Sequence, residues 1–242
     1  MLGKKLLSLT FCCLIGLVGT ISAQETSLTG EQIVKKMAAQ YAVAKSYQDI
    51  GIAQRIASDG STVLASEPAV YFKTYFDRPN RFRFEWENQV TSKSWSILWS
   101  DGADVYAKWA QRGPEKQANL DVGITGATAL SLGAARLVPN LLMREVSGFR
   151  LTQMQRVTRL RDEKVGDELC FVVRGHHPYG FQIDLWISKT DFMLRKEREK
   201  NDDGSYNEEL RSDIKTNGDI PSETFQFRPV QKGELIAQLI SR

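Results

Sequence analysis

The chain has 242 residues, of which 42% are hydrophobic and 25% are charged. That content of apolar and aromatic side chains is enough to offset the entropy of ordering, which excludes a disordered polymer. The length allows one domain or two small ones. A formal net charge of +3 lacks the strongly basic character of nucleic-acid-binding proteins, so no nucleic-acid partner is expected.

Residues 1–23 are predicted to be a secretory signal peptide. Lys4 and Lys5 form a basic start, an apolar run follows from Leu6 to Val18, and Ile21-Ser22-Ala23 ends in a small residue suited to cleavage. The apolar run is shorter than the roughly 18 residues of a membrane span, which disfavours an uncleaved anchor. Cleavage predicts export to the periplasm.

A lipid-modified cysteine is a third interpretation of the same segment, through Cys12 or Cys13. It is disfavoured because bulky Phe11 stands where a small residue should precede the modified cysteine. The mature chain would then be residues 24–242, read as a single domain because it shows no repeat and no low-complexity linker. Its only cysteine is Cys170, so an internal disulfide is excluded and stability must come from packing.

The mature chain opens with a predicted helix over residues 30–45. Thr29 and Gln32 have the spacing of a capping box, and Leu28 and Ile33 occupy the positions of a hydrophobic staple. Apolar residues then recur at helical spacing on one face, at Ile33, Met37, Tyr41 and Ala44.

After this helix the apolar period changes to two, which is typical of antiparallel strands with one buried face. The alternating apolar positions are Phe82, Phe84 and Trp86; Trp95, Ile97 and Trp99; and Phe181, Ile183, Leu185 and Ile187. Leu98 and Trp186 break the alternation. Turn signals separate the strands at Asp59-Gly60, Arg78-Pro79-Asn80, Asp101-Gly102, Pro178-Tyr179-Gly180 and Asp203-Gly204. The pattern predicts a meander.

Residues 124–143 are expected to form a helix or a loop and helix laid against the sheet. The surrounding stretch, 122–135, carries no charge and is too short to span a bilayer. Its glycines, Gly123, Gly126 and Gly133, indicate either a mobile segment or close packing of helix on sheet. A second, weaker helix is predicted over 233–241 from the spacing of its apolar residues.

The sequence holds none of the standard catalytic or phosphate-binding motifs, so no enzymatic activity, cofactor or catalytic residue is predicted. His176 and His177 are adjacent on a predicted strand and would point to opposite faces, which argues against a shared metal. Paired carboxylates such as Glu208 and Glu209 are interpreted as surface charge that can pair across strands. No metal site is expected.

Large apolar side chains are unusually abundant on one predicted face of the sheet. They either fill a closed core or line a cavity suited to an acyl chain, and the sequence leaves both alternatives open. The predicted lipid-binding residues are Phe72, Phe82, Phe84, Trp86, Trp95, Trp99, Leu130, Leu137, Phe181, Ile183 and Leu185.

The order of these elements resembles the LolA/LolB superfamily of periplasmic lipoprotein carriers and its lipoprotein-sorting relatives. The resemblance covers nearly all of the mature chain. The segments that carry it are the helix at 30–45, the run 72–86 with Arg78-Pro79-Asn80-Arg81-Phe82-Arg83-Phe84, the hairpin 97–106 and the segment 123–138. Later segments are Leu185-Trp186-Ile187-Ser188 with Leu194-Arg195-Lys196-Glu197, and the ending 220–227.

The resemblance implies a mainly β (α+β) fold, an incomplete antiparallel barrel closed by a few helices. It implies a carrier that shields acyl chains of a lipid or lipoprotein, with an inner-membrane release complex or an outer-membrane receptor as further partners. In such carriers an arginine helps to hold a helical lid shut, and Arg55, Arg81 and Arg83 are the candidates here. The alternative is a periplasmic regulatory or structural domain that binds a partner protein, as in envelope-stress sensors of this fold.

Overall fold

The computed structural model describes residues 28–66, 69–88 and 95–229, together with residues 235 and 237. The predicted signal peptide and most of the predicted tail helix lie outside these residues. Within the part of the chain that is described, no helix is long and apolar enough to cross a membrane.

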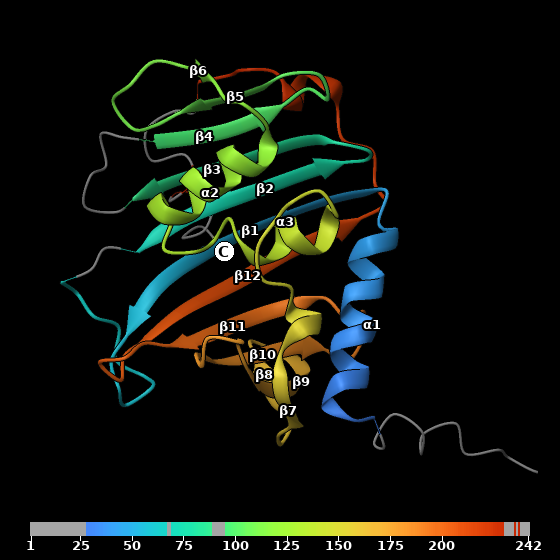
Figure 1. Ribbon diagram of the computed structural model, residues 1–242, viewed down its shortest axis with the longest axis vertical. Helices are drawn as coiled ribbons and strands as arrows, with labels where there is room; N and C mark the ends of the chain where they lie inside the picture. Colours follow the sequence, from blue (N-terminus) through green and yellow to red (C-terminus); the bar gives the residue numbers. More distant parts are fainter. Residues whose placement is uncertain (1–27, 67–68, 89–94, 230–234, 236, 238–242) are drawn as a thin grey trace, which may run out of the picture.

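The described residues form one antiparallel sheet and a few helices (Figure 1). The strands are Ser46–Ile56 (β1), Val70–Asp77 (β2), Arg81–Asn88 (β3), Trp95–Ser100 (β4), Val105–Lys108 (β5), Glu115–Lys116 (β6), Gln155–Arg159 (β7), Glu163–Val165 (β8), Glu168–His176 (β9), Gln182–Ser188 (β10), Leu194–Lys200 (β11) and Tyr206–Thr216 (β12). The helices are Gly30–Val43 (α1), Leu120–Leu130 (α2) and Leu137–Leu142 (α3), with 3-10 turns at Leu151–Gln153 (η3) and Ser222–Phe225 (η4).

The sheet has the strand order β6-β5-β4-β3-β2-β1-β12-β11-β10-β9-β7, with β8 paired to β9. The central pair consists of β1, from the early part of the chain, and β12, from its late part, which run antiparallel over most of their length. The edge strands β6 and β7 do not pair with each other along this order. This is the incomplete antiparallel barrel, mainly β with a few helices, that the sequence predicts.

The three α-helices lie on one face of the sheet, here called the inner face (Figure 1). α1 begins with the predicted capping box, in which Gln32 N donates to the Thr29 side chain and Thr29 N donates to the Gln32 side chain. α2 and α3 fill the predicted helical segment. A Cβ on Gly123 would lie 2.4 Å from Leu98 and one on Gly126 would lie 3.2 Å from Trp109, so these two glycines permit close packing of helix on sheet.

The opposite, outer face of β3 and β4 is covered by the C-terminal segment 222–228. Arg83 is fully buried and donates to the carbonyls of Thr224, Gln226 and Arg228. Phe227 packs on Trp99, with ring centroids 4.9 Å apart. Two covered faces explain why β4 does not follow a simple alternation of polar and apolar residues.

The predicted orientation of β4 is wrong for this reason. Leu98 pairs with Phe84 in the ladder and shares its place in the core beneath the helices. Trp95 and Trp99 therefore point to the outer face, since successive strand residues alternate. The turns predicted at Asp101-Gly102 and at 178–180 do connect β4 to β5 and β9 to β10.

Gly51 should be the least replaceable glycine of the central strand. A Cβ there would lie 2.2 Å from the Phe72 ring and 2.5 Å from the Leu210 carbonyl oxygen. We expect Gly51→Ala to lower the free energy of unfolding by about 2 kcal/mol or more, because the ring and the backbone must shift. Urea denaturation measures the change.

Gly113→Ala is the matched control, because a Cβ at Gly113 meets no atom within 4 Å. It should change stability by less than about 0.5 kcal/mol. Equal effects of the two substitutions would contradict the packing described for β1.

Candidate functional site

Seven of the proposed lipid-binding side chains lie together in the core between the inner face and the helices. Each is at most 3% exposed. They are Phe72, Phe82, Phe84, Trp86, Leu137, Ile183 and Leu185. They come from β2, β3, β10 and α3, so the sheet brings together residues that are more than a hundred positions apart in the chain.

The other four proposed residues lie elsewhere. Trp95 and Trp99 are on the outer face, beside Phe227. Leu130 is 55% exposed, because the buried stripe of α2 passes through Ile124 and Ala127 and turns its last residue away from the sheet. Phe181 follows the β9–β10 turn and is 38% exposed. These four do not line the inner face.

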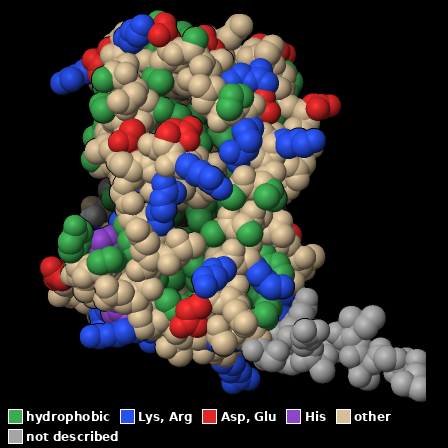
Figure 2. Space-filling view, turned by 45° about the vertical axis from the view of Figure 1, so that its right-hand side comes forward, with side chains coloured by type: hydrophobic (Ala, Val, Ile, Leu, Met, Phe, Trp, Pro, Cys, Tyr) green, Lys and Arg blue, Asp and Glu red, His purple; other side chains and the backbone are tan. Residues whose placement is uncertain are grey.

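Aromatic rings fill the inner face beneath α2. Phe84 lies 5.7 Å from Phe72 and 5.3 Å from Trp86, and Trp86 lies 5.8 Å from Trp109, measured between ring centroids. The face is therefore packed around these rings in this structure. On the surface that carries the helices, apolar side chains show in hollows between Lys and Arg side chains (Figure 2).

Residues 120–142, comprising α2, the connection 131–136 and α3, form a cover over this apolar face, here called the lid. Ile124, Ala127 and Leu137 turn inward and are buried against the sheet. The connection between the helices approaches the centre of the sheet. Ala134 and Ala135 of this connection are buried in the core, and the Ala134 carbonyl and the Arg136 side chain also make polar contacts with the sheet.

Those polar contacts belong to a group of charged side chains enclosed between sheet and lid, here called the ionic cluster. Its members are Asp49 of β1, Glu197 and Glu199 of β11, Glu209 and Arg211 of β12, and Arg136 of the lid. Four carboxyl groups therefore surround two guanidinium groups.

Arg211 lies at the centre of the ionic cluster, with 1% of its side chain exposed. It forms ion pairs with Asp49 and Glu209, and its Nη2 donates to the carbonyl of Ala134 in the lid at 2.8 Å. Asp49 Oδ2 also accepts from the Tyr47 hydroxyl at 2.6 Å. One guanidinium thus ties the two central strands to the lid.

Arg136 makes the second link between lid and sheet. Its Nη2 pairs with Glu199 and lies 3.6 Å from Glu197 Oε1. Some buried polar atoms of the cluster have no hydrogen-bond partner among the described residues: Asp49 Oδ1, Arg136 Nε and Glu197 Oε1. Such atoms are costly, and in native structures they call for an explanation.

Burial shifts the acidic groups of the cluster toward their neutral forms. Burial, together with the charges of Glu209 and Glu199, raises the pKa of Glu197 to about 8 against the opposing effect of Arg136. Burial also raises the pKa of Glu209, although Arg211 opposes it. Glu197 is therefore mostly protonated at neutral pH, because burial disfavours its charged form and the neighbouring carboxylates of Glu209 and Glu199 add to this effect.

The arginines proposed from sequence to hold a lid have other partners. Arg55 pairs with Asp203, Arg81 with Asp77, and Arg83 with Glu85 and the C-terminal segment. Arg211 and Arg136 bridge the sheet and the lid instead, and Arg78 of the β2–β3 turn donates to the Leu142 carbonyl at the end of the lid. The expected cross-strand pairing is present at Arg198 and Glu208, 2.6 Å apart. Glu208 and Glu209 are both buried, however, so their interpretation as surface charge is wrong.

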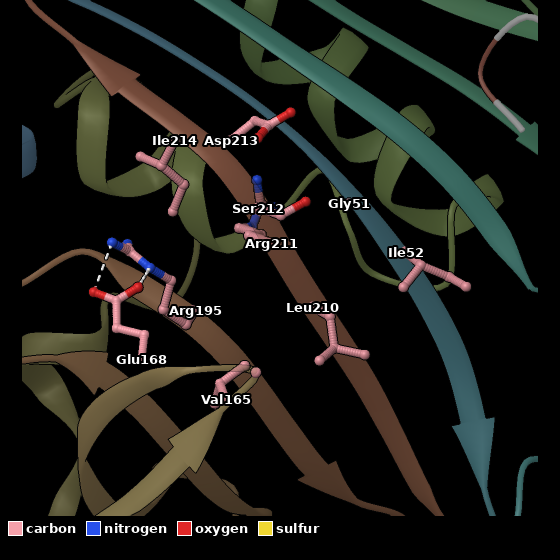
Figure 3. Close-up of a pocket in the computed structure, with 11 residues that line it drawn as sticks. Gly51, Ile52, Val165, Glu168, Arg195, Leu210, Arg211, Ser212, Asp213 and Ile214 are labelled. Atoms are coloured by element: carbon pink, nitrogen blue, oxygen red, sulfur yellow. Dashed lines mark hydrogen bonds and ion pairs between the residues drawn. The ribbon is translucent and has the colours of Figure 1, made fainter. Parts of the chain in front are cut away.

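A pocket of about 460 Å³ lies on the outer face, between β12 and the β8–β9 hairpin (Figure 3). Its charged wall is the pair of Arg195 and Glu168, in which Arg195 Nε lies 2.5 Å from the carboxylate. The pocket is separated from the aromatic side chains by the sheet itself. His177 lies against Phe149 in a tilted arrangement, with ring centroids 4.1 Å apart. Among the described residues, no three His, Cys, Asp or Glu side chains are arranged so that they could hold a metal ion.

Comparisons with known proteins return similar folds at low sequence identity. No protein-family model matches the chain, and no curated protein matches it by sequence. An outer membrane lipoprotein-sorting protein domain from Vibrio parahaemolyticus is 12% identical, with 81% of this chain and 96% of that chain covered and a TM-score of 0.39.

A LolA superfamily protein from Nitrosomonas europaea is also 12% identical, with 83% and 99% of the two chains covered and a TM-score of 0.36. MucB in the Pseudomonas aeruginosa MucA/MucB complex is 12% identical, with 82% of this chain and 61% of that chain covered and a TM-score of 0.43. These similarities concern the fold, so function is argued below from the residues of this chain.

Glu197→Gln should change how stability depends on pH. The folded state retains a proton on Glu197 up to about pH 8, whereas an exposed glutamate releases it near 4.5. The unfolded state therefore binds fewer protons between these values, and the stability of the native protein falls as pH rises through that window. The glutamine variant lacks this loss, so its gain in Tm over the parent should be larger at pH 8 than at pH 5.

Glu208→Gln is the matched control, on the neighbouring strand β12 and on the outer face, where Glu208 pairs with Arg198. It removes the partner of Arg198 and should not stabilise the protein at either pH. Thermal unfolding followed by circular dichroism at the two pH values measures both variants. A gain for Glu197→Gln that does not grow with pH would contradict the described ionisation of the cluster.

Proposed function

We propose that this protein is an exported periplasmic carrier or binding protein that shelters the acyl chains of a lipid or lipoprotein between the inner face and the lid. The observation that carries the proposal is the contrast between the apolar floor and the ionic link above it. Phe72, Phe84 and Trp86 form the floor, while Arg136 and Arg211 join the lid to the sheet.

An apolar floor of this kind can exchange one apolar cover for another. An acyl chain that replaced Ile124, Ala127 and Leu137 would restore the contacts that the sheet loses when the lid moves. Burial of each methylene contributes about 0.8 kcal/mol, so a chain of ordinary length could supply on the order of 10 kcal/mol. The rings that fill the face now would then become the walls of the bound state.

The construction of the lid favours such an exchange. α3 has six residues and no side-chain hydrogen bond at its N-cap. The connection to α2 passes through Gly133 at a φ of +92°, a conformation that glycine adopts without strain. Ion pairs and single hydrogen bonds can be replaced by contacts with water when they open, whereas interdigitated side chains cannot. The lid is therefore the part of the inner face most suited to move.

The resemblance of the sequence to lipoprotein carriers agrees with this proposal. A membrane release complex and a receptor would be the partners that load and unload such a carrier. The experiment is native mass spectrometry of the protein purified from the periplasm without detergent. A bound mass identified as a phospholipid or an acylated peptide is the expected result.

A bare protein that also fails to take up a fluorescent fatty acid would overturn the carrier function. Co-purification of one stoichiometric protein partner in that case would favour the regulatory domain instead. The packed inner face of the present structure is compatible with that function, because a filled core needs no ligand.

Arg136→Gln should speed the entry of an apolar probe. The substitution leaves Glu199 without its ion-pair partner and weakens one of the polar links that hold the lid to the sheet. We expect the rate of uptake of N-phenyl-1-naphthylamine to rise about threefold to tenfold, equivalent to about 0.7–1.4 kcal/mol of lost lid stabilisation. Stopped-flow fluorescence measures the rate.

Arg112→Gln is the control, since Arg112 is exposed on the β5–β6 turn. It removes the same charge from an exposed side chain and should leave the rate unchanged. Identical rates for the two variants would show that the link through Arg136 does not limit access to the inner face.

A further inference from the structure

The ionic cluster contains more negative groups than positive ones, and the lid supplies part of the positive charge. Asp49, Glu197, Glu199 and Glu209 all belong to the sheet, whereas Arg136 belongs to the lid. When the lid moves away, Arg136 moves with it. Four carboxyl groups would then face the groove with Arg211 as their only cation in the cluster.

We infer that the ligand of the inner face carries a positive charge, and that the ionic cluster is a recognition site for an ammonium or guanidinium group attached to an acyl chain. The inference rests on the proposed function, because it assumes that an acyl chain takes the place of the lid. The cation of the ligand would take the position that Arg136 occupies in the closed structure.

Buried acceptor atoms support this assignment independently of the charge count. Glu197 has 7% of its side chain exposed and Asp49 has none, yet Glu197 Oε1 and Asp49 Oδ1 have no hydrogen-bond partner among the described residues. Both atoms lie within the ionic cluster. An ammonium group has three donors and a guanidinium group has five, which suits such acceptors.

The protonation of Glu197 has the same cause. Its carboxyl group is enclosed with Glu199 and Glu209, and burial together with these two charges raises its pKa to about 8. In the closed structure a proton therefore neutralises charge that a further cation would otherwise balance. An arriving cation would lower that pKa again, and Glu197 would release the proton.

The ionisable groups around Glu197 come from each element packed against it. Those that act on Glu197 itself are Arg136 of the lid, Glu199 of β11, and Glu209 and Arg211 of β12. Tyr41 of α1 and Tyr47 and Asp49 of β1 interact with Arg211, and His177 after β9 interacts with Arg136 and Glu199. Burial raises the pKa of Tyr41 to about 12 and also raises the pKa of Tyr47 well above its usual value, and it lowers the pKa of His177, as does Arg136. All three are therefore neutral at pH 7.

An anionic amphiphile would encounter the opposite electrostatics. The carboxylate of a free fatty acid would lie against carboxylates that its own chain has shielded from water, and like charges in a desolvated site repel strongly. The inner face should therefore discriminate between ligands of equal chain length by the charge of the head group.

The test compares dodecylamine, dodecanol and dodecanoate, which share one chain and differ in head group. Each is titrated into the purified full chain at pH 7, below its micellar concentration, by isothermal calorimetry in phosphate and in Tris. We expect dodecylamine to bind about tenfold or more tightly than dodecanoate. Its binding enthalpy should differ between the buffers, because Glu197 releases a proton.

Variants of the ionic cluster test whether it causes the preference for dodecylamine. Glu197→Gln combined with Glu199→Gln should reduce the ratio of the dodecylamine affinity to the dodecanoate affinity to below about threefold. The binding enthalpy of dodecylamine should then no longer depend on the buffer. Glu208→Gln, which removes the same kind of charge from the outer face of β12, should keep both the preference for dodecylamine and the dependence of its binding enthalpy on the buffer. Circular dichroism of each variant verifies its fold, and Glu199→Gln alone, at a partly exposed position, serves if the double variant is unstable.

The outcomes separate this inference from the proposed function. Dodecanoate binding as tightly as dodecylamine, or a preference that the double variant retains, would overturn the inference and leave the carrier intact. Failure of all three amphiphiles to bind would overturn both. If the inference holds, native mass spectrometry of the loaded protein distinguishes an aminolipid from an acylated peptide with a basic residue.

Discussion

The burial of one guanidinium group, that of Arg211, organises the centre of this molecule. The register of the strands explains how the guanidinium group fits into the interior, because Gly51 of β1 lies between Arg211 of β12 and Phe72 of β2. With no side chain at Gly51, the guanidinium reaches across and stacks over the Phe72 ring, 4.7 Å from its centroid. A desolvated charge needs full pairing, and Asp49, Glu209 and the Ala134 carbonyl supply it. The central strands and the lid are thus fixed by a single group.

The interior contains two kinds of contact: apolar packing in the floor and ionic contacts around Arg211. Apolar packing in the floor is nondirectional and tolerates a change of partner, provided that the volume is filled. The ionic contacts are directional and must be satisfied, or the exposed charges must be neutralised. An interior that combined only the first kind would bind any apolar chain. If the proposed function holds, the second kind makes the identity of the head group matter.

Local signals in the sequence predicted the elements, but they could not predict which face of each strand is covered by what. The capping box at Thr29 and the turn at Asp101-Gly102 depend on residues within a few positions, and both form as expected. The predicted orientation of β4 was wrong because the segment around Phe227, near the far end of the chain, covers the outer face of this strand. No periodicity within residues 95–100 contains that information.

The ionic cluster escaped detection for a related reason. Glu209 and Arg211 stand in a strand crowded with charges, where surface exposure is the ordinary outcome, and Asp49 lies more than 150 positions away. One signal was present: charges occupy both alternating faces of Tyr206–Thr216, although a strand at the centre of a sheet has one face in the core. Only the pairing of β1 with β12 identifies these as partners.

The lid also occupies a particular place in the chain. It follows β6 and precedes β7, the two strands at opposite edges of the sheet, so its ends are tethered to the two rims of the incomplete barrel (Figure 1). Any change in the curvature of the sheet alters the distance that the lid must bridge. A guest that spreads the rims would stretch the segment that joins them, and a guest that brings the rims closer would slacken it. The shape of the sheet and the state of its cover are therefore mechanically coupled.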